Sequence, residues 1–248
     1  MNKPLLSACR STNDQLGKVA ILSPASGMQL RLFQAIMHTA AASVVSLLRQ
    51  LAAPSFSYHL VVEADDPKAG AAVPGIKTGT TTRVFTTTNS DGFLLQGDRA
   101  FSLFGLTLDA SVAGTTVTFQ YFNGTAYATL PLISTPLFAS NGDKVCFFIP
   151  PADWVPGTTA AVGGDAGKYS ILVLATVAGA TAITATNIWV AESLVTYETG
   201  AAGQESFLFH TGVDGGQPIM FNGTEALVAY NSAANAKHVG SFLYEISQ

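Results

Sequence analysis

The sequence has few charged residues. Only 11% of its 248 residues are Asp, Glu, Lys or Arg, against roughly 25% in an average globular domain. Between Ala100 and Gly142 the single charged residue is Asp109, and between Tyr169 and Ala191 there is none. Because an isolated domain usually needs a more charged surface to stay soluble, we expect other subunits to cover much of this one. The alternative is a robust secreted-type β protein with a Thr-rich surface.

Basic clusters and long apolar segments are also missing. The formal net charge is −4 and no basic run is longer than two residues, so the electrostatic pattern of a nucleic-acid-binding protein is absent. No run of about 18 apolar residues occurs, so we expect no transmembrane helix. We therefore expect neither a nucleic acid nor a membrane as a partner.

The residues that usually hold metals or perform catalysis are few and scattered. The two cysteines, Cys9 and Cys146, have no metal-binding spacing and are interpreted as free thiols. No histidine belongs to an HxH or HExxH pattern, and the four are His38, His59, His210 and His238. The serine-hydrolase pattern GxSxG is absent as well.

The acidic residues stand mostly in turn-like contexts, and five of the 16 are next to glycine: Asp91, Asp98, Asp143, Asp165 and Asp214. We therefore expect no catalytic, cofactor-binding or metal-binding residues and no enzyme activity. A polysaccharide hydrolase remains an open alternative, because two carboxylates distant in sequence can meet in the fold.

The clearest structural signal is a β-hairpin within Gly114–Leu130. Two runs of alternating β-formers flank Asn123-Gly124, a pair that strongly favours a two-residue hairpin turn. Such a turn predicts Phe122 opposite Thr125, Tyr121 opposite Ala126 and Phe119 opposite Ala128. Large residues on one strand would then meet small residues on the other, as a packed sheet face requires.

Short apolar runs separated by turn residues continue along most of the chain, and they predict an all-β fold. The expected strands are 18–22, 29–37, 43–49, 57–63, 82–87, 92–95, 100–108, 144–149, 169–177, 187–191, 206–210, 218–221, 226–230 and 238–246. We expect an antiparallel β-sandwich or jelly-roll-like architecture.

One segment, Leu32–Leu51, also fits a helix. Its apolar residues recur at helical spacing and neither glycine nor proline interrupts it. We favour strand–turn–strand, because 38–43 is small and polar enough to turn and because Val44 and Val45 are β-branched.

Two Gly- and Ala-rich breaks, 64–79 and 199–203, suggest a discontinuous organisation. We expect residues 1–16 to form an N-terminal arm that a partner subunit holds. Residues 17–75 and 196–248 would form an outer β-sandwich, and residues 76–195 would form a second sandwich inserted into it.

Trp154 is the aromatic residue that most invites a functional interpretation. It lies in a proline-rich loop, Pro150–Pro156, which would hold the ring rigidly. The ring could stack on a sugar, anchor an interface, or close the open end of a sandwich. Trp189, within a predicted strand, is expected in the core.

Two sets of motifs resemble structural proteins of bacteriophage particles. In the inserted segment these are Gly114, Val117–Gln120, Asn123-Gly124 and Tyr127, followed by Phe147 to Trp154. In the outer segment they are Ser26–Leu32, Gly223–Leu227, Ser232–Ala236 and Val239–Glu245.

The resemblance implies a virion protein that is not an enzyme, most simply a capsid decoration (cement) protein. Its partners would be further copies of itself, with a trimer favoured, and the major capsid protein or other virion proteins. The alternative is a carbohydrate- or receptor-binding module at a tail tip or fibre, with a glycan as ligand.

Overall fold

A computed structural model gives the fold of the chain. It describes residues 6–11, 17–39, 44–51, 55–61, 73–74, 82–85, 92–110, 116–133, 140–158, 164–177, 183–198, 205–210, 217–223, 225–231 and 238–247. Within these ranges the regular elements are all strands, so the predicted all-β class is confirmed. No helix in these ranges is long and apolar enough to cross a membrane.

The chain forms two compact units. Unit 1 consists of Met1–Gln50 and Glu192–Gln248, and unit 2 of Leu51–Ala191. The first boundary therefore lies near residue 50, whereas the expected domains changed at residue 75. The difference arises because β5 (Phe56–Val61) pairs with β8 (Gly92–Gly97), a strand of unit 2.

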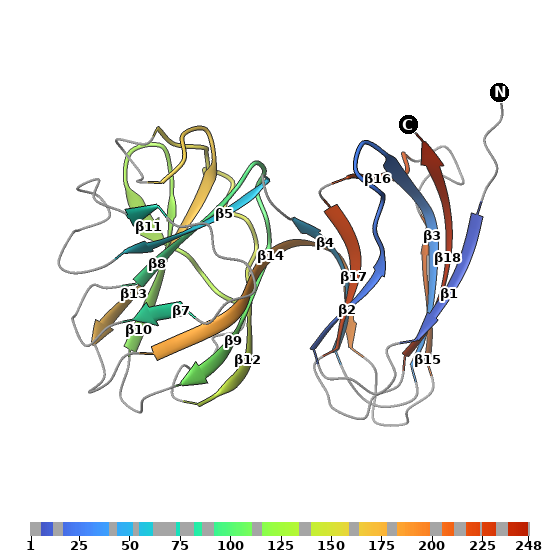
Figure 1. Cartoon of the computed structure of the whole chain (residues 1–248), viewed down its shortest axis with the longest axis horizontal. Coiled ribbons are helices and arrows are strands. Elements are labelled where there is room, and N and C mark those ends of the chain that lie inside the picture. Colours follow the sequence, from blue (N-terminus) through green and yellow to red (C-terminus); the bar gives the residue numbers. More distant parts are fainter. Residues whose placement is uncertain are drawn as a thin grey trace. The chain divides into compact units, whose positions relative to one another are not determined.

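Unit 1 contains two facing layers of antiparallel strands (Figure 1). Sheet A has the order β1-β18-β3-β15, and β16 also pairs with β3. Its strands are β1 (Leu6–Ser11), β3 (Gln29–Thr39), β15 (Glu205–His210), β16 (Ile219–Asn222) and β18 (His238–Ser247). In the opposing sheet, β14 (Ile183–Glu198), β4 (Val44–Leu51), β17 (Glu225–Asn231) and β2 (Gly17–Leu22) are neighbours in that order.

The core of unit 1 lies between these sheets. Both sheets contribute to one apolar cluster, whose buried members are Ile21, Leu22, Leu30, Leu32, Ala35, Met37, Leu47, Phe221, Leu227, Ala229 and Phe242. Arg49 of β4 adds a polar link, because its Nη1 donates to the carbonyl of Met220 on β16 at 2.9 Å and its Nε donates to Glu192 at 2.9 Å. A second link runs from the backbone N–H of Asn222 on β16 to the carboxylate of Glu225 on β17 at 3.0 Å, so unit 1 is a β-sandwich whose sheets are joined by side-chain hydrogen bonds as well as by its core.

Unit 2 is built in the same way. One sheet, sheet C, has the order β11-β10-β13-β8-β5-β6 and contains, besides β5 and β8, β6 (Val73–Pro74), β10 (Thr116–Phe122), β11 (Tyr127–Thr129) and β13 (Tyr169–Val177). The other places β9 (Leu103–Ala110) between β12 (Gly142–Phe147) and β14, and β7 (Thr82–Phe85) pairs with β14.

Sheet C is buried on both faces along β8. All six residues of that strand are buried. Phe93 and Leu95 join the main core of unit 2, while Leu94 joins a second cluster on the opposite face with Phe122, Tyr127 and Leu172. A strand with two buried faces shows no apolar–polar alternation, as in its sequence GFLLQG.

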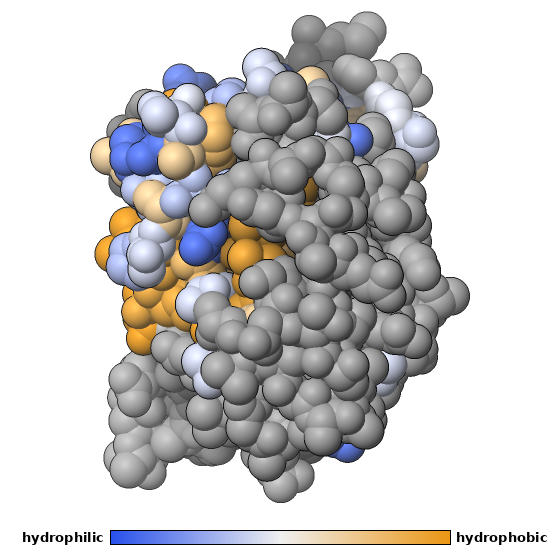
Figure 2. Space-filling view, turned by 90° about the vertical axis from the view of Figure 1, so that its left-hand side faces the viewer, coloured by the Kyte–Doolittle hydropathy of each residue, from blue (hydrophilic) through white to orange (hydrophobic). Residues whose placement is uncertain are grey.

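Apolar residues of unit 2 also appear at the surface of the molecule (Figure 2).

The predicted hairpin exists, but its predicted register is wrong by two residues. Phe122 pairs with Tyr127, Tyr121 with Ala128 and Gln120 with Thr129. The turn is centred one residue later: the backbone N–H of Asn123 donates to the carbonyl of Ala126 at 3.1 Å across Gly124-Thr125, and the Asn123 side chain accepts hydrogen bonds from the backbone N–H groups of Thr125 and Ala126 at 3.0 and 2.9 Å. A shift of two residues keeps every side chain on its predicted face. The predicted pairing of large with small residues holds only in part, because Tyr121 lies opposite Ala128 but Phe122 lies opposite Tyr127.

Segment 32–51 forms strands, as favoured, with residues 40–43 outside the described ranges. A bulge explains its helix-like spacing. The register between β3 and β18 shifts so that Gln34 faces Leu243 while Leu32 faces Tyr244, leaving Phe33 as an extra residue. Buried residues on either side of the bulge, Leu32 and Ala35, are thus three positions apart.

The N-terminal arm of residues 1–16 was expected to be irregular and held by a partner subunit, and this expectation is corrected in part. Residues Leu6–Ser11 form β1, which pairs antiparallel with β18 of the same chain. The backbone of β18 supplies the hydrogen bonds that the polar sequence of β1 needs. Residues 1–5 and 12–16 lie outside the described ranges.

Trp189 is buried, as expected, but it lies on the face of its sheet opposite the main core. A bulge after Thr186 places Ile188 and Val190 in the core and turns Trp189 over Gly105, its partner on β9. A Cβ atom at Gly105 would fall well inside van der Waals contact with the indole ring. The absence of a side chain at position 105 therefore makes room for Trp189.

We predict that Gly105→Ala lowers the free energy of unfolding by about 1–3 kcal/mol, because the added methyl group collides with a buried ring. Alanine in place of a strand glycine would otherwise stabilise. Urea denaturation measures the effect, and a double-mutant cycle with Trp189→Ala is the control. An equal cost of Gly105→Ala in both backgrounds would refute the explanation.

Candidate interaction surfaces

The sequence offered no catalytic or metal-binding candidates to place. In the described part of the chain, no three His, Cys, Asp or Glu residues are grouped so that they could hold a metal ion. Cys146 is buried and free, and burial raises the pKa of its thiol. His38 is exposed, while the side chains of His59, His210, His238 and Cys9 lie outside the described set.

Trp154 closes the end of the unit 2 sandwich. Its side chain is 5% exposed, and its ring meets those of Phe101, Phe148 and Tyr169 edge-on at centroid distances of 5.1, 6.1 and 5.5 Å. Its Nε1 donates to the carbonyl of Ser170 at 3.2 Å. Of the three interpretations of this residue, the structure supports packing, because the ring offers no free face for a sugar.

The loop that carries Trp154 is also fixed by hydrogen bonds. The hydroxyl of Tyr121 on β10 donates to Asp153 at 2.8 Å, and the backbone N–H of Val155 donates to the carbonyl of Phe122 at 3.3 Å. The hydrogen bond to the Asp153 carboxylate, together with partial burial, raises the pKa of Tyr121.

A second loop, around Asp165, is fixed by a buried glutamine. Gln96 on β8 accepts a hydrogen bond from the backbone N–H of Asp165 at 2.7 Å and donates to the hydroxyl of Ser170 at 2.8 Å. Lys168 adds ion pairs with Asp98 at 3.4 Å and Asp165 at 3.8 Å. This end of unit 2 is therefore stiff and well suited to present a fixed surface.

That stiff unit exposes two large aliphatic side chains. Ile133 and Ile149 are 69% and 71% exposed. Ile133 donates its backbone N–H to Phe147 at 2.8 Å, and Leu132 forms a bridge with Phe148. Since Leu132 and Phe148 face the core, the alternation of strands turns Pro131, Ile133, Phe147 and Ile149 to the outside. We call these four residues the isoleucine patch.

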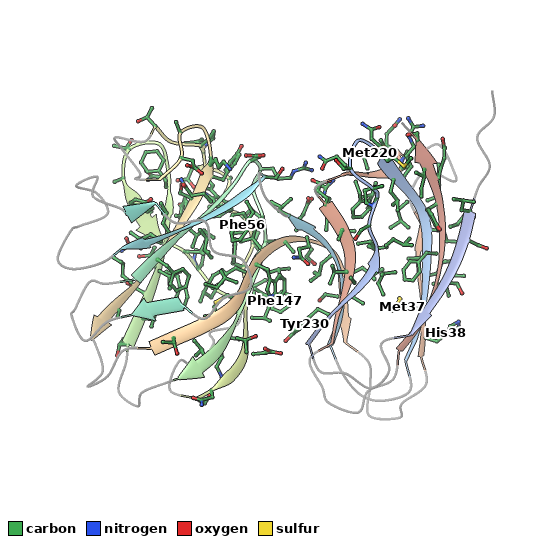
Figure 3. The ribbon with its side chains drawn as sticks, viewed as in Figure 1. Met37, His38, Phe56, Phe147, Met220 and Tyr230 are labelled. Atoms are coloured by element: carbon green, nitrogen blue, oxygen red, sulfur yellow. The ribbon has the colours of Figure 1, made fainter. Side chains whose placement is uncertain are left out.

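Unit 1 exposes the outer face of sheet A. Figure 3 shows Met37 pointing between the sheets and its neighbour His38 pointing away from them. The same alternation places Gln34 and Ile36 outside on β3, with Leu243 and Ser241 opposite them on β18. Leu208 lies opposite Ile36 on β15 and is 51% exposed. We call Gln34, Ile36, Leu208, Ser241 and Leu243 the neutral face, because none of them is charged.

Neither surface was singled out by the sequence. An exposed isoleucine in a loop and an exposed leucine in a strand look like core residues in a linear pattern. The signal that the sequence did give was the low charge of the whole chain, and it led to the expectation of covered surfaces.

Comparison with known proteins adds little. No family model and no curated protein matches the chain. Structures of infectious bursal disease virus, Gt and Gx strains, align over 99% and 98% of this chain and 82% and 80% of theirs, at 11% and 12% identity with TM-scores of 0.19 and 0.18. VP17, a capsid protein of bacteriophage P23-77, aligns over 99% of this chain and 97% of its own at 10% identity and a TM-score of 0.16. Such low scores establish no relationship, so function has to be inferred from the chain's own surfaces.

We predict that Trp154→Ala lowers the free energy of unfolding by about 3–5 kcal/mol, because a buried aromatic side chain is removed. Trp154→Phe keeps a ring but loses the hydrogen bond to Ser170, so it should cost less. The control is Ile149→Ala at an exposed position of the same unit, which should change the free energy of unfolding by no more than about 0.5 kcal/mol. If urea denaturation shows that Trp154→Ala costs no more than Ile149→Ala, the packing interpretation is contradicted.

We also predict a loss of stability in alkali. The pKa values of Tyr121 and Tyr127 are raised above the ordinary tyrosine value of about 10, the first mainly by the hydrogen bond to Asp153 and the second mainly by burial. Groups whose pKa is raised by folding stabilise the protein fully below their unfolded pKa, and this contribution is lost as the pH rises past it. Denaturation measured from pH 8 to 11 should show falling stability above about pH 10, less steeply in Tyr121→Phe and Tyr127→Phe. An unchanged slope in both variants would refute the assignment.

Proposed function

We propose that this protein is a structural component of a virus particle, most simply a capsid decoration or cement protein of a bacteriophage. The observation that carries the proposal is that each β-sandwich has an uncharged surface, the neutral face on unit 1 and the isoleucine patch on unit 2. Apolar and neutral residues bury at an interface without the desolvation cost that unpaired charges incur. A chain with these surfaces gains most when neighbouring subunits cover them.

The mechanism is adhesive and makes or breaks no covalent bond. The unit 2 sandwich resists deformation because its loops are fixed to it, as Asp165 is by Gln96 and Asp153 is by Tyr121. A rigid surface loses little conformational freedom on binding. Weak contacts at each copy then add up when many copies bind one lattice.

The partners we propose are other copies of this chain and the major capsid protein. The isoleucine patch is the surface that we assign to the shell, because it is the most exposed apolar feature of the described residues. The competing role, a sugar- or receptor-binding module of the tail, depended on an accessible Trp154. The burial of that ring removes its main support.

The test is binding of purified protein to particles of the virus whose genome encodes it, from which the protein has been stripped or deleted. We predict saturable co-sedimentation with the empty shell. Ile133→Asp and Ile149→Asp should each weaken binding by at least about tenfold, because a carboxylate would have to be desolvated.

Thr125→Asp is the matched control, since it adds the same charge at an exposed position of the same unit. It should leave both binding and stability unchanged. A chain that is absent from purified particles and does not bind stripped ones would overturn the proposed role.

A further inference from the structure

We propose that the neutral face of unit 1 binds the neutral face of a second copy of this chain about a two-fold axis. The proposal rests on the structural role proposed above and names one of its contacts. It is argued from the pattern of neutral and charged residues across sheet A.

The register of sheet A arranges the outward-facing residues in rows across the strands. One row places Leu208, Ile36 and Ser241 side by side, and the next places His210, Gln34 and Leu243 in register. Neither row contains an Asp, Glu, Lys or Arg residue, and we call them the uncharged centre. Exposed Leu208 and half-buried Ile36 and Leu243 supply its apolar area.

Opposite charges stand at one end of this centre. Arg31 on β3 pairs directly with Glu245 on β18, and both face outward because Leu30 and Leu32 point into the core. Both side chains are half buried, and the Nε of Arg31 has no hydrogen-bond partner among the residues that the structure describes. The face thus carries one cation and one anion on its two central strands.

This arrangement is complementary to itself. A two-fold axis parallel to the strands, between β3 and β18, lays β3 of one copy over β18 of the other. Arg31 of each copy then faces Glu245 of its partner, so the contact contains two equivalent ion pairs. The same operation places Gln34 over Leu243 and Ile36 over Ser241. No Asp, Glu, Lys or Arg side chain of one copy then lies over the uncharged centre of the other.

The face is small for a permanent dimer. Four strands about 4.8 Å apart and some six residues of about 3.3 Å each span roughly 14 by 20 Å. A stable interface usually buries about 800 Å² on each partner. We therefore expect reversible, concentration-dependent pairing in solution that becomes persistent when the copies are also held on a lattice.

Charge reversal tests the contact by sedimentation equilibrium over a range of concentrations. Arg31→Glu and Glu245→Arg should each weaken self-association by at least about tenfold, because each brings like charges together across the axis. The double variant should associate as the parent does. A mixture of the two single variants should also associate, because every facing pair is then opposite in charge.

The mixture separates the contact from an effect on folding. Arg31 and Glu245 are also neighbours within one chain, so a single reversal could destabilise sheet A itself. Mixing cannot repair such an internal defect, whereas it repairs a contact between copies. Leu208→Asp should weaken pairing as well, while Ile133→Asp in unit 2 should not.

The proposal is overturned if the single variants associate as the parent does, or if their mixture stays monomeric. A parent chain that is monomeric at every concentration and still binds shells would overturn this contact alone. A chain that pairs as described but fails to bind shells would overturn only the role in the particle.

Discussion

Burial of apolar side chains between two facing sheets is the interaction on which each unit depends. In unit 1 the cluster around Met37 and Phe242 joins sheet A to the sheet of β4, β17 and β2. In unit 2 the cluster around Phe93 and Phe104 does the same. Because these cores provide the stability, the outer faces are free to carry few charges. Surfaces that would be a solubility problem for a monomer become available as contacts between subunits.

The positions of most strands could be predicted from the sequence, because turn residues and alternation are local signals. What failed was the register wherever an extra residue or a side-chain hydrogen bond intervened. Phe33 is an extra residue in β3, and it spaced the buried residues so that a helix remained a reasonable alternative. At the hairpin, the Asn123 side chain bonds to the backbone of a turn centred on Gly124-Thr125, whereas the preference of Asn-Gly for two-residue turns predicted a turn centred on Asn123-Gly124.

The candidate surfaces were less predictable than the fold. Composition indicated that parts of the surface would be covered, but it could not tell which apolar residues face outward. Ile149 follows an apolar strand and is indistinguishable in sequence from its buried neighbour Phe148. Trp154 was ambiguous for a different reason, since a proline-rich loop can hold an aromatic ring either at the surface or in the core. Only the positions of Phe101 and Tyr169, distant in sequence, decide between them.

The discontinuous layout of unit 1 has a consequence for biosynthesis. Residues 51–191, which make up unit 2, emerge as one continuous stretch, so all its strands exist before β15 is made. The three described partners of β3, which are β15, β16 and β18, all follow unit 2 in the chain, and β1 pairs with β18, the last described strand. The ribosome therefore finishes one sandwich while the other still has an open edge, and the sheet whose outer side is uncharged is completed last.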